Sequence, residues 1–117
     1  AAKWYREAAD QGNADAQYNL GIMYYNGEGV SQDLTEAVEW YRKAAEQENV
    51  NAQFELGFMY VLGNGVAQDY VLAHMWLNLS VAQGHKDARE GRDLVAERMT
   101  SEQIASAQRM AREFSNR

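Results

Sequence analysis

Apolar and small residues recur at helical spacing along the first half of the chain. After Asn13, a residue type that favours helix N-termini, the side chains of Ala16, Leu20 and Tyr24 stand four residues apart. Residues at that spacing share one face of a helix. The pattern therefore predicts an amphipathic helix over residues 14–25 with a single apolar side.

A turn and a second helix follow. Residues 27–30, Gly-Glu-Gly-Val, place two glycines where the chain can take a positive φ and leave the first helix. Asp33 opens the next helix, with Glu36 three residues later as in a capping box. Its apolar side alternates large rings with small residues, which lets neighbouring helices approach, and consists of Ala37, Trp40, Tyr41, Ala44 and Ala45.

The same helix-turn-helix pattern repeats after 36 residues. Trp4, Trp40 and Trp76 are 36 residues apart, and residues 1–36 laid over 37–72 are identical at 19 positions. The second copy contains Asn49, Ala52, Leu56, Gly57, Tyr60, Gly63, Gly65, Val66, Asp69 and Ala73. Such self-similarity is typical of a solenoid, which buries its core between neighbouring units and leaves a long face free for other molecules.

The pattern weakens after Trp76. Arg92 and Asp93 stand where Leu20 and Gly21 stand in the first full unit. One helical side persists through Ala88, Gly91, Val95 and Met99. After Thr100, a capping residue type, a last helix carries a narrow apolar stripe of Ile104, Ala107, Ala111 and Phe114, with Arg109, Arg112 and Glu113 facing outward. A terminal helix with a polar back closes a solenoid against water.

These features predict one domain over residues 1–117. Residues 1–12 form the second helix of a truncated repeat, 13–48 and 49–84 form two complete repeats, and 85–117 form a degenerate repeat with a capping helix. The first edge lacks a cap. We therefore expect an exposed apolar face there, which further repeats upstream or a second copy of the chain would cover.

The residues that recur in each unit, with their spacing, resemble the pattern of the Sel1-like repeat family, a 36-residue relative of the tetratricopeptide repeat. The resemblance rests on Ala14, Ala16, Leu20-Gly21, Tyr24, Gly27-Glu28-Gly29-Val30, Asp33, Ala37 and Trp40-Tyr41, and it covers about residues 1–84. It implies an all-α fold, an α/α right-handed superhelix of helix-turn-helix repeats with a C-terminal capping helix. It also implies a bacterial source and a non-enzymatic adaptor that holds a protein or peptide client.

In such arrays the first helix of each unit usually lines the concave face. Aligned on the Leu-Gly-x-x-Tyr core, the outward positions are Asp15, Tyr18, Ile22, Tyr25 and Asn26, then Asn51, Phe54, Phe58, Val61 and Leu62. Glu90, Leu94, Glu97 and Arg98 would extend the same surface. These residues predict an aromatic trough with polar edges, although bulky residues on a first helix can instead pack against the next unit.

Composition and charge narrow the possible partners. Residues 1–84 contain 4 Lys and Arg against 11 Asp and Glu, whereas residues 85–117 contain 7 against 6, which together give the net charge of −6. A nucleic-acid site needs a basic surface, so nucleic acid is not an expected partner. No membrane span is expected either. The first residues show no signal peptide, and the absence of cysteine fits a bacterial cytoplasm or periplasm equally.

Candidate chemistry is sparse. His74 and His85 have no cysteine or acid at metal-ligand spacing, and nothing in the sequence desolvates one of two neighbouring carboxylates selectively. We therefore predict no catalytic residues, no cofactor and no metal. Two alternatives to the adaptor remain open. One is a small-ligand binder or β-lactam-type hydrolase, as described for a cysteine-rich branch of Sel1-like proteins, and the other is a structural spacer.

Overall fold

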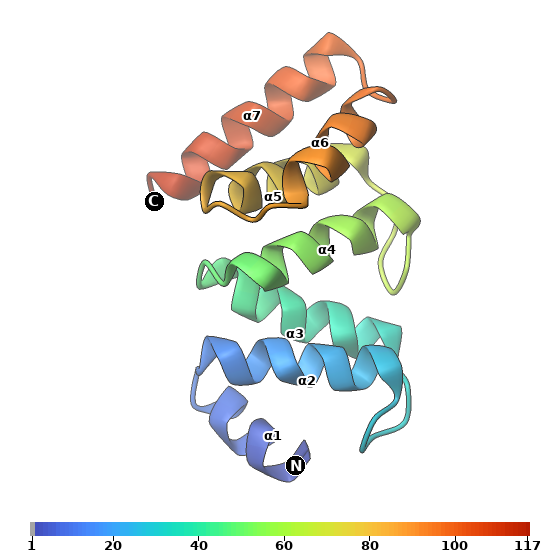
Figure 1. Cartoon of the computed structure of the whole chain (residues 1–117), viewed down its shortest axis with the longest axis vertical. Coiled ribbons are helices and arrows are strands. Elements are labelled where there is room, and N and C mark those ends of the chain that lie inside the picture. Colours follow the sequence, from blue (N-terminus) through green and yellow to red (C-terminus); the bar gives the residue numbers. More distant parts are fainter. Residues whose placement is uncertain (1) are drawn as a thin grey trace.

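The computed structural model describes residues 2–117 as a stack of seven helices, with no strand among these residues. The helices are α1 (Ala2–Asp10), α2 (Ala14–Asn26), α3 (Leu34–Glu46), α4 (Val50–Leu62), α5 (Tyr70–Ala82), α6 (Ala88–Ala96) and α7 (Ser101–Ser115). They pile up along the long axis of a body of 44 × 27 × 22 Å (Figure 1). The predicted all-α repeat fold is confirmed. Ala1, which the sequence assigns to the first helix, lies outside the described residues.

The predicted caps begin and end the helices of both full units. The Asn13 side chain accepts a hydrogen bond of 2.9 Å from the backbone N–H of Ala16, and Asn49 does the same for Ala52. Each bond satisfies one of the backbone donors that a helix start leaves free. At the other end, Gly27 takes a left-handed conformation with φ 71°, which lets the chain turn out of α2. The N-cap side chains and the glycines at the C-terminal ends therefore set where these helices begin and end.

Glycines allow the two helices of a unit to pack closely. A Cβ atom on Gly21 would lie 2.6 Å from the ring of Tyr41, so α2 and α3 approach to a distance that no other residue permits. Gly57 has the same role against Leu77 in the next unit, with 2.8 Å to its Cγ. This contact explains why a glycine follows the leucine in both units.

A ladder of buried amides joins successive units. The Gln53 side chain is 1% exposed, donates to the carbonyl oxygen of Ala45 at 3.2 Å and accepts from Gln83 Nε2 at 2.8 Å. Gln17 repeats the arrangement one unit earlier, where Gln47 Nε2 donates to it at 2.8 Å. A buried amide is tolerated only when its hydrogen bonds are made. These glutamines explain a repeated polar position that the hydrophobic pattern alone leaves unexplained.

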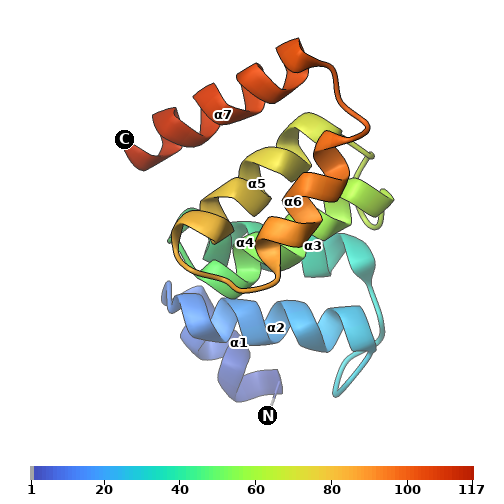
Figure 2. The same ribbon diagram turned by 45° about the horizontal axis from the view of Figure 1, so that its top comes forward.

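The C-terminal helix closes the array as the sequence predicts. Figure 2 shows α7 lying along α5, with α6 on the other side of α5. The rings of Trp76 and Phe114 meet edge to face at 5.3 Å, and Ala107 and Ala111 are buried. The Thr100 side chain accepts from the N–H of Gln103 while the Gln103 side chain accepts from Thr100, which completes a capping box.

The three tryptophans lie in two different environments. Trp40 and Trp76 are each 6% exposed, and Trp40 packs against Ala9, Ala16 and Leu20 of the preceding helices. Trp4 occupies the same repeat position but is 66% exposed. The interpretation of the tryptophans as core residues is therefore right for Trp40 and Trp76. Trp4 instead marks the apolar edge that the sequence predicts at the N-terminal end.

Candidate functional site

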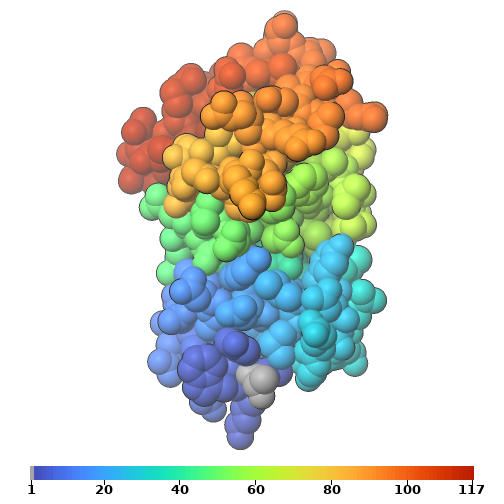
Figure 3. Space-filling model, in the orientation of Figure 1, coloured from blue at the N-terminus to red at the C-terminus, as the bar shows by residue number. Residues whose placement is uncertain are grey.

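The helices α2, α4 and α6 lie on one side of the stack, toward the viewer in Figure 1, and we call their outer surface the first-helix face (Figure 3). None of the ten residues predicted to line it is fully buried. The exposed ones are Asp15, Tyr25, Asn26, Asn51 and Leu62, and the half-buried ones are Tyr18, Ile22, Phe54, Phe58 and Val61. Their accessibility is compatible with partner binding.

The aromatic residues of this face are shared between the core and the surface. The rings of Phe54 and Phe58 meet edge to face at 4.9 Å, and Phe54 stacks on the imidazole of His85 at 4.1 Å. Tyr18 leans on Tyr41 with ring centroids 5.9 Å apart. Phe54, Phe58 and Tyr18 are partly buried and pack against the main core. Their role in partner binding stays a prediction.

Two of the predicted polar residues are already engaged within the chain. Asp15 Oδ1 accepts a hydrogen bond of 3.0 Å from the Asn49 side chain of the next unit, and Asn26 Nδ2 donates to Glu28 at 3.1 Å. The two residues lie near opposite ends of α2.

A small apolar cavity of about 130 Å³ opens between α4 and α6. It is lined by Phe58, Val61, Tyr70, Gly91, Leu94, Val95 and Arg98. A Cβ on Gly91 would lie 2.9 Å from the ring of Phe58, so a glycine is needed for α6 to reach this ring. The sequence predicts Phe58, Val61, Leu94 and Arg98 here. It does not reveal Tyr70, because that residue begins a second helix in the repeat pattern.

Glu55 is the charged residue of the face that sequence reasoning misses. Its carboxylate lies on α4, and burial raises its pKa above the usual value. Burial also raises the pKa values of Tyr18 and Tyr41, and the nearby charge of Glu55 raises both further. The available signal was a single acid between Phe54 and Leu56 in an otherwise apolar stretch.

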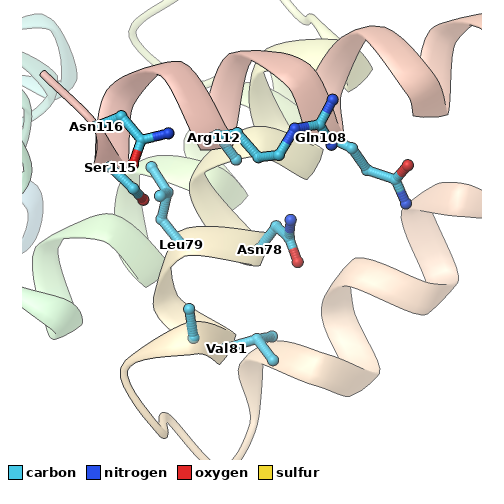
Figure 4. A pocket seen from close by; sticks show the side chains of 9 residues that line it. Asn78, Leu79, Val81, Gln108, Arg112, Ser115 and Asn116 are labelled. Atoms are coloured by element: carbon cyan, nitrogen blue, oxygen red, sulfur yellow. The ribbon is translucent and has the colours of Figure 1, made fainter.

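A second and larger crevice, of about 450 Å³, lies between α5 and α7 (Figure 4). Asn78, Gln108, Arg112, Ser115 and Asn116 give it polar walls above an apolar base of Leu79 and Val81. The nine lining residues include no carboxylate, histidine or cysteine.

The two histidines lie in different surroundings, His74 within α5 and His85 in the loop before α6. His74 is 3% exposed, its Nδ1 atom has no partner within residues 2–117, and burial together with nearby Arg92 lowers its pKa. No group of three or more metal-ligating side chains occurs among residues 2–117. In the same range, every helix is too short or too polar to cross a membrane.

Stacked pairs of 13-residue helices with glycine contacts inside each pair define the class of α-helical repeat proteins. Within this class the chain belongs to the Sel1 repeat family, whose pattern matches residues 1–13, 14–49 and 50–85. Sel1-repeat proteins are generally scaffolds for protein interaction, and their fold is typical of non-enzymatic scaffolds.

Three solved bacterial structures are similar to this chain. One is c5321, a protective antigen of uropathogenic Escherichia coli strains with an SLR fold, at 36% identity and a TM-score of 0.93. Another is a Sel1 repeat protein from Oxalobacter formigenes, at 41% identity and a TM-score of 0.78. The third is Helicobacter pylori cysteine rich protein B (hcpB), at 25% identity and a TM-score of 0.73.

The similarity covers different shares of these proteins. It spans 97% of this chain but 25% of c5321, 80% of this chain but 38% of the Oxalobacter protein, and 76% of this chain and 67% of hcpB. The chain thus corresponds to a quarter or somewhat more of the first two relatives. No curated protein matches it.

Proposed function

We propose that this chain is a non-enzymatic adaptor that binds a peptide or protein segment on its first-helix face. The observation that carries the proposal is the distribution of exposed apolar side chains. Four large ones are exposed in the described chain, and three of them, Tyr25, Leu62 and Leu94, lie on first helices. Exposed apolar residues that gather on one face of a soluble repeat array favour protein binding.

The cavity beside these residues adds a place for one side chain of a partner. Leu62 and Leu94 are 60% and 57% exposed, and Leu94 also lines the cavity of about 130 Å³ between α4 and α6. That volume suits one aliphatic or aromatic side chain, and such anchors supply much of the binding energy of an interface. Docking of a helix or an extended chain along the face would satisfy this geometry.

Replacing both exposed leucines should remove the binding. In a pull-down with mass spectrometry, we expect Leu62→Ser combined with Leu94→Ser to lose the clients that the parent protein recovers. Titration of a recovered client should show a loss of affinity of about tenfold or more, since an interface anchor contributes about 2 kcal/mol. Arg109→Ser is the control, because Arg109 is exposed but lies on α7, away from both proposed association surfaces. Equal recovery by the double variant would refute the proposal.

These leucines make a cleaner test than the aromatic residues. Removing the rings of Tyr18 and Phe58 would also weaken binding, but both rings pack against the main core. We therefore expect Tyr18→Ala with Phe58→Ala to lower the melting temperature as well. Leu62 and Leu94 are mostly in solvent, so their replacement should change binding without a comparable loss of stability.

The N-terminal edge is a second proposed association surface, for further repeats or for another copy of the chain. The exposed Trp4 ring lies edge to face on Tyr5 at 5.2 Å and has no counterpart of the Ala9 and Leu20 contacts that cover Trp40. Light scattering at high concentration should show dimers of the parent protein and a monomer for Trp4→Ser. A monomeric parent protein at millimolar concentration would rule out self-association through this edge.

A further inference from the structure

We propose that protonation of His74 opens the junction between α5 and α6, so that the first-helix face loses its apolar cavity and releases a bound partner as the pH falls. The release of a partner rests on the proposed adaptor function, whereas the opening of the junction is a property of this chain alone. The starting point is an imidazole inside the stack. His74 is 3% exposed, and its Nδ1 atom is buried with no hydrogen-bond partner within residues 2–117.

The repeat fold does not require a histidine at this position. Val38 stands 36 residues earlier, on α3, is 1% exposed and packs in the main core. A valine has no polar side-chain atom to satisfy. His74 fills the same place with an ionisable ring, and a buried polar atom without a hydrogen bond costs free energy. A titratable side chain where valine serves the fold indicates a role that depends on its proton.

The helix that packs on this side of α5 changes as well. Arg92 and Asp93 of α6 stand where the two full units carry their Leu-Gly pair. Arg92 Nη1 donates to Asn78 Oδ1 at 2.9 Å, and Asn78 follows His74 by about one turn on the same side of α5. The guanidinium is therefore held over the side of α5 that carries His74. A positive charge on the imidazole would be repelled by it.

Asp93 is the charge that favours protonation of His74. Its carboxylate is bonded to Arg92 Nε at 3.2 Å and its side chain is 62% exposed, so water screens its attraction for the imidazole. Burial lowers the pKa of His74 most, Arg92 lowers it further, and Asp93 opposes them to a smaller extent. The other titratable residues on the helices packed against α5 are Glu55 and Tyr60 on α4, Arg89 and Glu90 on α6, and Glu102, Arg109, Arg112 and Glu113 on α7.

Acidification destabilises the junction because the pKa of His74 is lowered. With α6 moved away, the imidazole takes up a proton near its ordinary pKa of about 6.5, whereas the closed junction holds the pKa below that value. Above about pH 6.5 neither state binds the proton, so His74 does not disfavour the closed junction. Below it the open state binds the proton first. The opening constant then rises by at most about tenfold per pH unit, the limit for one proton.

Opening of α6 would dismantle the proposed binding cavity. Gly91, Leu94 and Val95 line the cavity from α6, and Phe58 lines it from α4. Figure 2 shows α6 lying against α5 and α4, so the two walls face each other only while the junction is closed. The exposed Leu94 would move with α6. Loss of the junction therefore removes one wall of the place that a partner side chain would occupy.

Two substitutions taken from the repeat itself test the junction. His74→Val restores the residue of the preceding unit, and the matched control His85→Asn replaces the other histidine by the asparagine found at positions 13 and 49. Native-state hydrogen exchange at about pH 7.5 and about pH 5.5 gives protection factors, which correct for the intrinsic exchange rate. In the parent protein and in His85→Asn, we expect the protection of α6 to fall relative to that of α2, by up to about tenfold per pH unit. In His74→Val this ratio should stay constant.

An unchanged ratio in the parent protein, or an equal fall in His74→Val, would overturn the proposal. His74→Leu is a second apolar variant that leaves a smaller cavity than valine and should also keep the ratio constant. The ring resonances of the parent protein give a reading that needs no variant. The His74 resonance should begin to shift at a lower pH in the folded protein than in urea, and titration at the same pH in both would contradict the proposal.

Benzene serves as a probe of the cavity. A dry apolar cavity of about 150 Å³ in another protein binds benzene, and the cavity between α4 and α6 measures about 130 Å³. In ¹⁵N-labelled parent protein, we expect saturable shifts of the Gly91 and Val95 amides at about pH 7.5 and their loss at about pH 5.5. His74→Val should keep them at both. Equal shifts at both pH values in the parent protein would refute the link between His74 and the cavity.

The clients recovered in the pull-down separate this inference from the proposed function. Clients that need Leu62 and Leu94 should leave the parent protein at about pH 5.5 and stay on His74→Val. If they also stay on the parent protein, the pH-dependent release is refuted and the adaptor function stands. Opening of α6 in a chain that recovers no client at either pH would support the role of His74 and contradict the adaptor function.

Discussion

Trp40→Ala should lose about 3–5 kcal/mol of unfolding free energy, the cost typical of emptying the site of a large buried aromatic ring. The ring is 6% exposed and fills the space between Ala9, Ala16 and Leu20, so its removal opens a cavity between two units. The total unfolding free energy of a domain of this size is about 5–15 kcal/mol, so this single loss would be a large share of it. Urea titration followed by circular dichroism should show the midpoint falling without a change of helix content in the absence of urea.

The repeat supplies its own control for that experiment. Trp4 stands at the same position of the pattern but is 66% exposed, so Trp4→Ala should cost less than about 1 kcal/mol. Trp40→Phe should fall between the two, because it keeps most of the ring and removes the Nε1 donor, which is buried without a partner in the described chain. Equal losses for Trp4→Ala and Trp40→Ala would show that the packing side of α3 is assigned wrongly.

Much of this fold can be predicted because each unit carries its own signals. Asn13 and Asn49 cap the first helices, and the Leu-Gly spacing fixes which side faces the partner helix. Such local rules act within a few residues, and the 36-residue period repeats them. The environment of Trp4 differs from that of Trp40 because a neighbour, rather than the local sequence, decides burial.

The site is less predictable, because its important features depend on contacts between units. The sequence places the aromatic residues of α2 and α4 on the first-helix face but does not show that each ring is half-buried. The stacking of Phe54 on His85 joins α4 to the loop before α6, across a stretch where the repeat is degenerate. Burial raises the pKa of Glu55, and the charge of Glu55 in turn raises the pKa values of Tyr18 and Tyr41, which belong to the preceding unit.

Gly65→Ala should lose about 2–5 kcal/mol of unfolding free energy, more than any other glycine replacement in the turns. The φ of Gly65 is 69°, where a side chain costs about 1–2 kcal/mol. Its new Cβ would also lie 2.3 Å from the carbonyl oxygen of Leu34 and 3.0 Å from the N–H nitrogen of Thr35. These are backbone atoms at the start of α3, so they cannot turn aside, and such overpacking adds about 1–3 kcal/mol.

Gly29→Ala separates the conformational cost of a positive φ from the steric cost of the contact between Cβ and backbone atoms. Gly29 stands 36 residues earlier with nearly the same φ of 75°, but its Cβ would meet the methyl group of Met23 at 3.2 Å and no backbone atom within 4 Å. A flexible methionine can move, so this variant should lose only the conformational cost of about 1–2 kcal/mol. Thermal unfolding of both variants measures the difference directly. A difference near zero would mean that the junction between the turn and α3 is loose, whereas a larger loss for Gly65→Ala would show that close backbone contact holds the two units in register.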